Sequence, residues 1–157
     1  MSARTGKQYV EGLRDDRVVW LGNQKVDVTT HPAFAGSVAG MAGYFDWQHE
    51  HAAECLTSDP QSGKPMSASL IVPRCADDLR RRRVAFERFA RYSVGMLGRT
   101  PDYVNVTLAG FVARSDIFGS KGDTTFAQRL QRFYREVVEK DLSLTHTIIH
   151  PVVDKTL

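Results

Sequence analysis

The sequence predicts a mainly α-helical fold, and long segments of helical periodicity are the observations that predict it. Apolar residues recur at helical spacing over residues 76–97, 101–118 and 123–140. A fourth helix is predicted for residues 33–50, which are rich in alanine and glycine. Strand patterns are confined to one early hairpin, one short segment over residues 67–73 and one terminal stretch. We therefore expect one helical domain over residues 1–140.

The first part of the chain combines a short helix, a hairpin and the alanine-rich helix. Residues 4–14 are compatible with a short helix or an extended arm. Residues 17–28 alternate apolar and polar side chains around Gly22-Asn23, which is typical of a β-hairpin. The helix over residues 33–50 needs tertiary packing because its glycines lower intrinsic helix stability. Its expected buried residues are Phe34, Val38, Met41, Phe45 and Trp47.

The middle of the chain is expected to form a loop over residues 56–64 and a short strand over residues 67–73. The three long helices that follow are expected to pack as an antiparallel bundle. Their predicted buried residues are Leu79, Phe86, Phe89, Ala90, Val94 and Leu97 in the first, Val104, Leu108, Phe111 and Val112 in the second, and Phe126, Leu130, Phe133, Tyr134, Val137 and Val138 in the third.

The composition and the net charge do not indicate a particular class of binding partner. A net charge of +3 and a pI near 9.0 are weakly basic, and the basic residues do not alternate with aromatic ones as in many nucleic-acid readers. Arg80 to Arg83 are therefore expected to form a solvated helix face, with RNA binding as the alternative. No segment has the apolar length of a signal peptide or a membrane span. We expect a soluble cytoplasmic protein that binds neither nucleic acid nor membrane.

The two cysteines, Cys55 and Cys75, indicate neither a metal site nor a disulfide framework. They have no CxxC spacing and no histidine at a ligand interval. His49 and His51 lie two residues apart and would point to different faces of a helix. We therefore expect no bound metal and a reducing compartment.

Residues 98–105 join a helix start to polar side chains that suit a phenol. Thr100 followed by Pro101 is typical of an N-cap and a first helical position. Asp102 suits the positive end of the helix dipole. Arg99 and Tyr103 flank this start, so both side chains can point into one space at the helix mouth, where anionic groups are commonly held. The alternative is a well-capped helix with a packed tyrosine.

After Asp141 the pattern favours an extended strand, since β-branched and apolar residues dominate residues 142–153. No later segment offers a partner for this strand. We expect residues 141–157 to be the first strand of a central β domain that the 157 residues otherwise do not contain. An apolar strand of this kind seeks a partner, so contacts between copies are expected through it.

Five motifs together resemble the flavin-dependent aromatic hydroxylases of the type of the 4-hydroxyphenylacetate 3-monooxygenase oxygenase component. The motifs are similar to that family's in order and span almost the whole chain. They are Arg4-Thr5-Gly6-Lys7-Gln8-Tyr9 with Gly12-Leu13-Arg14-Asp15, Asp27 to Phe34, Tyr44-Phe45-Asp46 with His49, Gly98 to Asn105, and Asp141-Leu142-Ser143-Leu144-Thr145-His146.

The resemblance implies an acyl-CoA-dehydrogenase-like architecture, with a helical N-terminal domain, a central β domain and a C-terminal helical bundle that forms tetramers. It also implies a two-component reaction. Reduced FAD (FADH2) comes from a separate flavin reductase, a flavin hydroperoxide forms with O2, and a phenolic small molecule is hydroxylated beside its hydroxyl group. The resemblance leaves open which phenol is used.

The resemblance also assigns site residues. Arg99, Tyr103 and His146 match residues that hold the substrate phenol, and Thr100 lies among them. The implied flavin contacts are His146, Val152, Asp154 and Lys155. The last three stand in segments that depart from the family, which usually has Asn-Pro-Gln and Asp-Arg-Ser where this chain has His150-Pro151-Val152 and Asp154-Lys155-Thr156.

We therefore expect the chain to be the N-terminal portion of a reduced-FAD-dependent phenol hydroxylase that carries part of the substrate pocket and is inactive alone. The alternative is a non-catalytic homologue that acts as a helical binding or interaction module. A nucleic-acid binder that uses Arg80 to Arg83 is a third hypothesis, and it predicts strongly salt-dependent binding.

Overall fold

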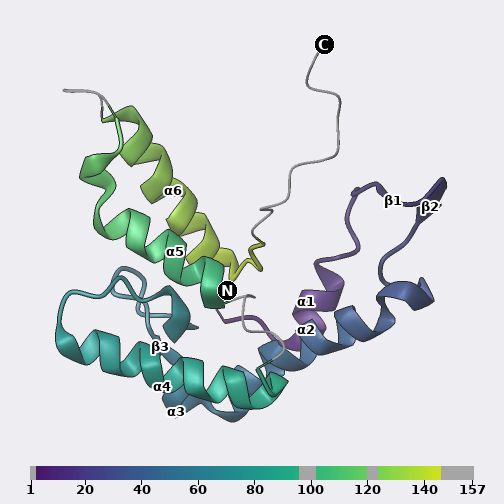
Figure 1. Cartoon of the computed structure of the whole chain (residues 1–157), viewed down its shortest axis with the longest axis horizontal. Coiled ribbons are helices and arrows are strands. Elements are labelled where there is room, and N and C mark those ends of the chain that lie inside the picture. Colours follow the sequence, from purple (N-terminus) through teal and green to yellow (C-terminus); the bar gives the residue numbers. More distant parts are fainter. Residues whose placement is uncertain (1–2, 96–101, 120–123, 146–157) are drawn as a thin grey trace.

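The computed structural model describes residues 3–95, 102–119 and 124–145 and is mainly helical, as the periodicity predicts (Figure 1). The helices are α1 (Gly6–Glu11), α2 (Pro32–Glu50), α3 (Ala52–Cys55), α4 (Ala76–Ser93), α5 (Asp102–Ala113) and α6 (Thr125–Lys140). Two hairpins pair β1 (Val19–Leu21) with β2 (Gln24–Val26) and β3 (Leu56–Ser58) with β4 (Pro65–Ser67). Two 3-10 turns are η1 (Ala68–Leu70) and η2 (Ser115–Ile117). No helix in these ranges is both long and apolar enough to cross a membrane.

The N-terminal segment forms a helix and the predicted hairpin. Thr5 and Gln8 form a reciprocal capping box at the start of α1, which decides between the helix and the extended arm. Gly22 turns the hairpin with a φ of 61°, a conformation that glycine adopts without strain. The hairpin projects away from the helices (Figure 1), and Trp20, in the middle of β1, is 63% exposed.

Helix α2 forms as predicted, but only its second half is covered. His31 caps it, because its Nδ1 accepts the Ala33 amide proton. Phe34 and Val38 are only half-buried, whereas Tyr44 and Phe45 are buried. Small residues permit close packing at one point, where Gly6 of α1 lies against the Ala42 carbonyl.

The strand predicted for residues 67–73 is wrong. The chain forms β4 earlier, over Pro65–Ser67, and then tightens into η1. The Ser67 hydroxyl accepts the Ser69 amide proton and lies 2.9 Å from the Ser69 hydroxyl, so this serine closes a turn instead of extending the strand.

Helix α4 buries only part of the face that was predicted. Phe89 is buried as predicted and Phe86 is partly buried against the core, but Leu79, Ala90 and Val94 are exposed, and Ala85 is buried in addition. The helix also ends before residue 97, because Val94 adopts the left-handed conformation with a φ of 52°.

The arginine run of α4 is not wholly solvated. Arg80 pairs with Asp77, in line with the expected solvated face. Arg82, however, is only 8% exposed, and its guanidinium lies 5.7 Å from the centre of the Phe86 ring. Burial lowers the pKa of Arg82. The expectation of four solvated arginines is therefore wrong at Arg82.

Helices α5 and α6 lie side by side and antiparallel, while α4 packs mainly on α2, α3 and η1 (Figure 1). The expected three-helix bundle is thus replaced by a helix pair, with η1 between that pair and α4. Helix α5 ends at Ala113, earlier than predicted, and η2 follows it. Phe111, Phe126 and Phe133 were expected to be buried, but all three are 45–51% exposed.

The core lies where these parts meet. Its buried residues are Tyr44, Phe45, Cys55, Met66, Ala68, Leu70, Ile71, Ala85, Phe89, Leu108, Tyr134, Val137 and Val138. The Tyr134 hydroxyl donates to the Leu70 carbonyl at 2.7 Å, which ties α6 to η1. Residues 142–145, the described part of the predicted terminal strand, belong to no strand, and the rest of that prediction lies outside the described residues.

Candidate functional site

Tyr103 is the one predicted substrate residue that the structure describes. It lies in the first turn of α5, its side chain is 43% exposed, and its carbonyl accepts the Thr107 hydroxyl proton at 3.0 Å. Helix α5 begins at Asp102, beside the predicted first helical position. The other predicted site residues lie outside the described residues, namely Arg99, Thr100, His146, Val152, Asp154 and Lys155.

A buried asparagine fixes the turn that carries Tyr103. Asn105 is 3% exposed, and its amide donates to the Ser69 hydroxyl at 2.8 Å. Ser69 is itself bonded to Ser67, so a relay of three polar side chains joins α5 to the second hairpin. The Asn105 side-chain oxygen is buried and accepts no hydrogen bond from the residues that the structure describes. A buried amide of this kind restricts how the start of α5 can rotate.

A second buried polar cluster fixes the motif that begins at Asp141, directly after α6. Asp141 is 4% exposed and left-handed, with a φ of 46°. Its Oδ2 accepts the Arg4 backbone amide at 2.8 Å and the Gln48 side-chain amide at 3.1 Å. Burial raises the pKa of the Asp141 carboxyl. Through its two hydrogen bonds, the Asp141 side chain holds three distant parts of the chain together at the point where the segment toward His146 begins.

The N-terminal motif supplies the other side of this cluster. The Arg4 guanidinium lies 4.8 Å from the centre of the Phe45 ring, and Tyr9 stacks on Phe45 with ring centres 5.2 Å apart. His49 Nε2 contacts the Ala3 and Arg4 carbonyls at 3.0 and 3.1 Å. Three of the motifs that carry the family resemblance therefore meet in one place.

The antiparallel helix pair brings Tyr103 and the segment that leads toward His146 to one end of the pair. The first turn of α5 carries Tyr103, and the last turn of α6 leads into Asp141 and residues 142–145 (Figure 1). The two turns lie at the same end of the pair because the helices run in opposite directions. His146 follows directly in the sequence.

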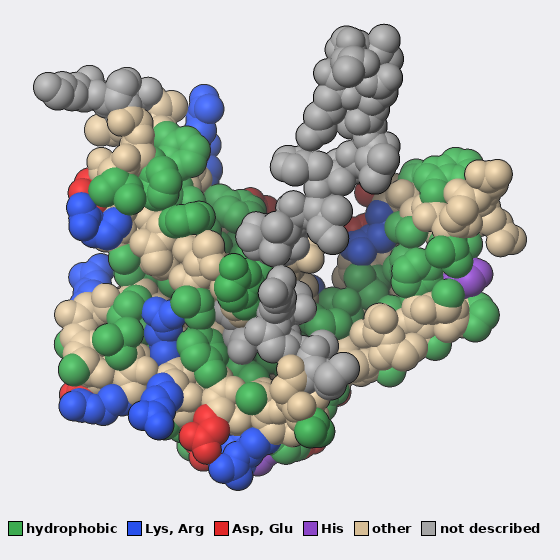
Figure 2. All heavy atoms as spheres, in the orientation of Figure 1, with side chains coloured by type: hydrophobic (Ala, Val, Ile, Leu, Met, Phe, Trp, Pro, Cys, Tyr) green, Lys and Arg blue, Asp and Glu red, His purple; other side chains and the backbone are tan. Residues whose placement is uncertain are grey.

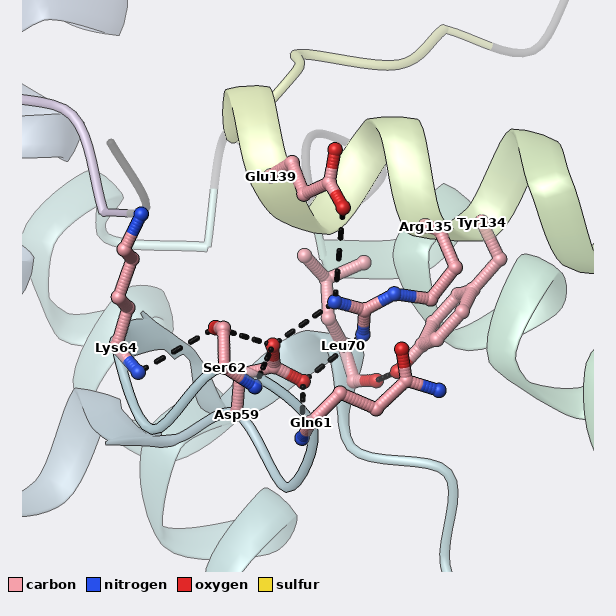
Figure 3. Close-up of polar contacts among 8 residues, drawn as sticks. All are labelled: Asp59, Gln61, Ser62, Lys64, Leu70, Tyr134, Arg135 and Glu139. Atoms are coloured by element: carbon pink, nitrogen blue, oxygen red, sulfur yellow. Dashed lines mark hydrogen bonds and ion pairs between the residues drawn. The ribbon is translucent and has the colours of Figure 1, made fainter.

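Another polar cluster lies midway along α6, away from Tyr103. Arg135 forms two hydrogen bonds to Asp59, at 2.8 and 2.9 Å, and Asp59 is 1% exposed (Figure 3). Asp59 also accepts the Ser62 hydroxyl and amide protons and the Gln61 amide proton. The Arg135 guanidinium, followed by the Ser62 and Gln61 donors, holds the pKa of Asp59 well below its usual range.

Sequence reasoning gave no role to Asn105, Gln48, Asp141 or Arg135. One local signal was present, since Gln48 and Asn105 are amides on otherwise apolar helix faces. Their partners lie 93 and 36 positions away, and no local periodicity reveals such pairing. Within residues 3–95, 102–119 and 124–145, no group of three or more His, Cys, Asp or Glu side chains is placed to hold a metal ion.

Comparisons with known proteins agree with the motifs. The family described as "4-hydroxyphenylacetate 3-hydroxylase N terminal" matches residues 5–157. The chain is 40% identical to the 4-hydroxyphenylacetate 3-monooxygenase oxygenase component of Geobacillus sp., over 99% of this chain and 32% of that protein. It is 35% identical to the 4-nitrophenol 2-monooxygenase oxygenase component of Rhodococcus sp., over 96% of this chain and 29% of that protein.

Solved structures show the same likeness. The oxygenase component of 4-hydroxyphenylacetate 3-monooxygenase, complexed with FAD and 4-hydroxyphenylacetate, matches with a TM-score of 0.85 at 34% identity, over 98% of this chain and 32% of that chain. Its fold is acyl-CoA-dehydrogenase-like, as the resemblance implies. The chain spans about a third of the length of these relatives. It belongs to the 4-hydroxyphenylacetate 3-hydroxylase family and corresponds to that family's N-terminal region.

Proposed function

We propose that this chain is the phenol-holding region of a reduced-flavin-dependent monooxygenase that hydroxylates a phenol beside its hydroxyl group. The observation that carries the proposal is the placement of Tyr103 and of the segment after Asp141 at one end of the α5–α6 pair. Each segment is fixed by its own buried polar cluster, and a site of this kind requires rigid positions. The family membership supplies the reaction class.

The residues have separate roles in this proposal. Arg99 and Tyr103 flank the start of α5 and hold the phenol oxygen, Arg99 by its charge and Tyr103 by its hydroxyl proton. His146, which follows the other segment in the sequence, takes up or returns the phenol proton, since the pKa of an ordinary imidazole lies near working pH. Stabilising phenolate character raises the electron density of the neighbouring ring carbon. Thr100 caps the helix and keeps Arg99 and Tyr103 in register.

The residue types proposed for flavin contact fit the edge of a flavin. The imidazole of His146, the carboxylate of Asp154 and the ammonium of Lys155 can bond the N–H and carbonyl groups of the ring, while Val152 can offer apolar contact. FAD, supplied reduced by a separate reductase, would provide the oxygen-activating chemistry with O2. The remaining flavin contacts would come from the portion of the relatives that this chain does not span.

We also propose that the working protein is a homo-oligomer. The projecting hairpin exposes three large apolar side chains, Val18, Trp20 and Leu21, and exposed apolar groups of this size favour burial against another surface. Val18 and Trp20 are more than half exposed, so a second copy or a further part of the enzyme has apolar area to cover.

A chimera tests the proposed function. Residues 1–157 would replace the matched third of the Geobacillus relative, and the product would be assayed with a flavin reductase, FAD, NADH and 4-hydroxyphenylacetate. We expect formation of the ortho-hydroxylated product. A chimera that folds and binds FAD but forms no product would refute the proposal.

The isolated 157-residue chain provides the matching control. We expect no product from it under the same conditions, because most of the flavin contacts are proposed to lie elsewhere. The alternative of a helical binding module would be favoured if the chimera stays inactive while the isolated chain binds a partner as a monomer.

A further inference from the structure

A groove of about 1000 Å³ lies between the loop after β3, the segment that leads into α4, the last turn of α5 and the middle of α6. Its volume is at the upper end of the range of roughly 300–1000 Å³ that small-molecule sites occupy. Tyr134 and the Asp59–Arg135 pair of Figure 3 form part of its wall. None of the described residues proposed for phenol hydroxylation lines it.

The floor of the groove is apolar. Met66 and Ile71 are buried beneath it, and Val72, Pro73 and Val112 continue the same surface. An aromatic or aliphatic body placed here would cover carbon atoms that otherwise face water, which is favourable in proportion to the apolar area removed.

The charges around the groove do not cancel. Asp59 is neutralised by its two bonds to Arg135. Asp78 Oδ2 accepts the Arg74 and Cys75 backbone amide protons at the start of α4, at 2.8 and 3.3 Å, and these amides, with a smaller contribution from the Arg81 guanidinium, lower the pKa of the Asp78 carboxyl. Four arginines line the groove, Arg74, Arg81, Arg132 and Arg135, against the two carboxylates Asp59 and Asp78, so the lining keeps a net charge of +2.

Three guanidinium groups remain around the floor. Arg74 precedes α4, Arg81 lies on α4 and Arg132 lies on α6. Their side chains form no hydrogen bond or ion pair with the described part of the chain. In Figure 2, Lys and Arg side chains gather at the left of the molecule, over α4 and over the α5–α6 pair above it. Cations on facing elements with an apolar surface between them suit a ligand with an apolar body and an anionic end.

We propose that this groove is a binding site for a small organic acid, in which the carboxylate is held by Arg81 and Arg132 and the hydrocarbon part lies on Ile71, Val72 and Val112. The site is separate from the position proposed for the phenol. Val112 lies nine residues after Tyr103 on the same helix, and at about 1.5 Å per residue this places the two roughly 14 Å apart.

Titration of the 157-residue chain with phenylacetate, followed by amide chemical shifts, tests the site. Phenylacetamide has the same shape without the charge and serves as the ligand control. We expect saturable shifts at Ile71, Val112 and Ala113, with phenylacetamide binding at least tenfold more weakly. The double variant Arg81→Gln/Arg132→Gln should weaken phenylacetate binding at least tenfold, and both side chains are exposed, so the fold is preserved. Arg83→Gln, also on α4 but outside the groove, should change nothing.

Three outcomes would overturn the proposal. They are the absence of saturable shifts at the groove, equal affinity for phenylacetate and phenylacetamide, and equal weakening by Arg83→Gln. Shifts confined to Tyr103 and its neighbours would place the acid at the proposed phenol site instead. Because the test uses no flavin and no turnover, its failure would leave the hydroxylase proposal standing, and an inactive chimera would leave this one standing.

Discussion

Removing Arg135 should destabilise the fold strongly, because it leaves a buried carboxylate without its cation. Asp59 is 1% exposed and receives two of its hydrogen bonds from Arg135. Breaking a buried ion pair by deleting one partner commonly costs about 3–5 kcal/mol. Ser62 and Gln61 still donate to Asp59, so the lower end of that range applies. We expect Arg135→Met to lower the free energy of unfolding by about 3 kcal/mol at pH 7.

The pH dependence has a definite sign. The pKa of Asp59 is depressed in the folded state, so its ionised form stabilises the fold above the unfolded pKa of about 3.9. This contribution is lost as the pH falls toward the folded pKa. The stability difference between the wild type and Arg135→Met should therefore be largest near neutral pH and shrink below about pH 4.

Urea unfolding followed by circular dichroism at several pH values measures both effects. The matched control is Arg129→Met on the same helix, since Arg129 is exposed and should change stability by no more than about 0.5 kcal/mol. A wild-type-like midpoint for Arg135→Met at pH 7, or a difference from wild type that grows on acidification, would refute the reasoning.

Three further predictions concern the other buried features. Asp141→Ala should lower the free energy of unfolding in urea by about 2–3 kcal/mol, because it leaves the buried Gln48 amide without its acceptor and places alanine in a left-handed conformation. Asp141→Asn keeps an acceptor oxygen and should cost about 1 kcal/mol or less, and equal losses for the two variants would count against the cluster. Gly43→Ala should lower the melting temperature, since a Cβ there overlaps the Tyr92 hydroxyl. Gly36→Ala, with open space around it, should raise stability by up to about 1 kcal/mol, and a Gly43→Ala variant more stable than Gly36→Ala would contradict the packing. Cys55 is buried, and burial raises the pKa of its thiol to about 11. A thiol reagent at pH 8 should therefore modify only the exposed Cys75 in the folded chain, and rapid modification of both thiols would contradict this.

The helices and the first hairpin were predictable because their signals are local. Periodicity located α2, α4, α5 and α6, and Gly22-Asn23 located the hairpin turn. Periodicity cannot say which apolar residues will find a covering partner. Leu79 and Phe126 therefore occur at the helical spacing from which burial was predicted, yet their side chains are exposed.

The polar interior was beyond sequence reasoning for a physical reason. Arg4 and Asp141 lie 137 positions apart, and only the folded chain brings them together. Arg82 belongs to a run that local pattern describes as solvated, yet the turn of α4 puts this one arginine inward over Phe86. The start of α5 was predictable, because Thr100-Pro101 is a local capping signal, and α5 does begin beside it.

The most direct test of the account is the effect of Tyr103→Phe on the chimera that carries residues 1–157. Removing one hydroxyl from a half-exposed side chain should leave the melting temperature unchanged, while kcat/KM for 4-hydroxyphenylacetate falls at least tenfold, or about 1.4 kcal/mol of transition-state stabilisation. Tyr9→Phe, which removes a hydroxyl from a ring stacked on Phe45, is the matched control and should retain wild-type turnover. If Tyr103→Phe instead hydroxylates 4-hydroxyphenylacetate as fast as the parent chimera, Tyr103 does not hold the phenol and the proposed site is wrong.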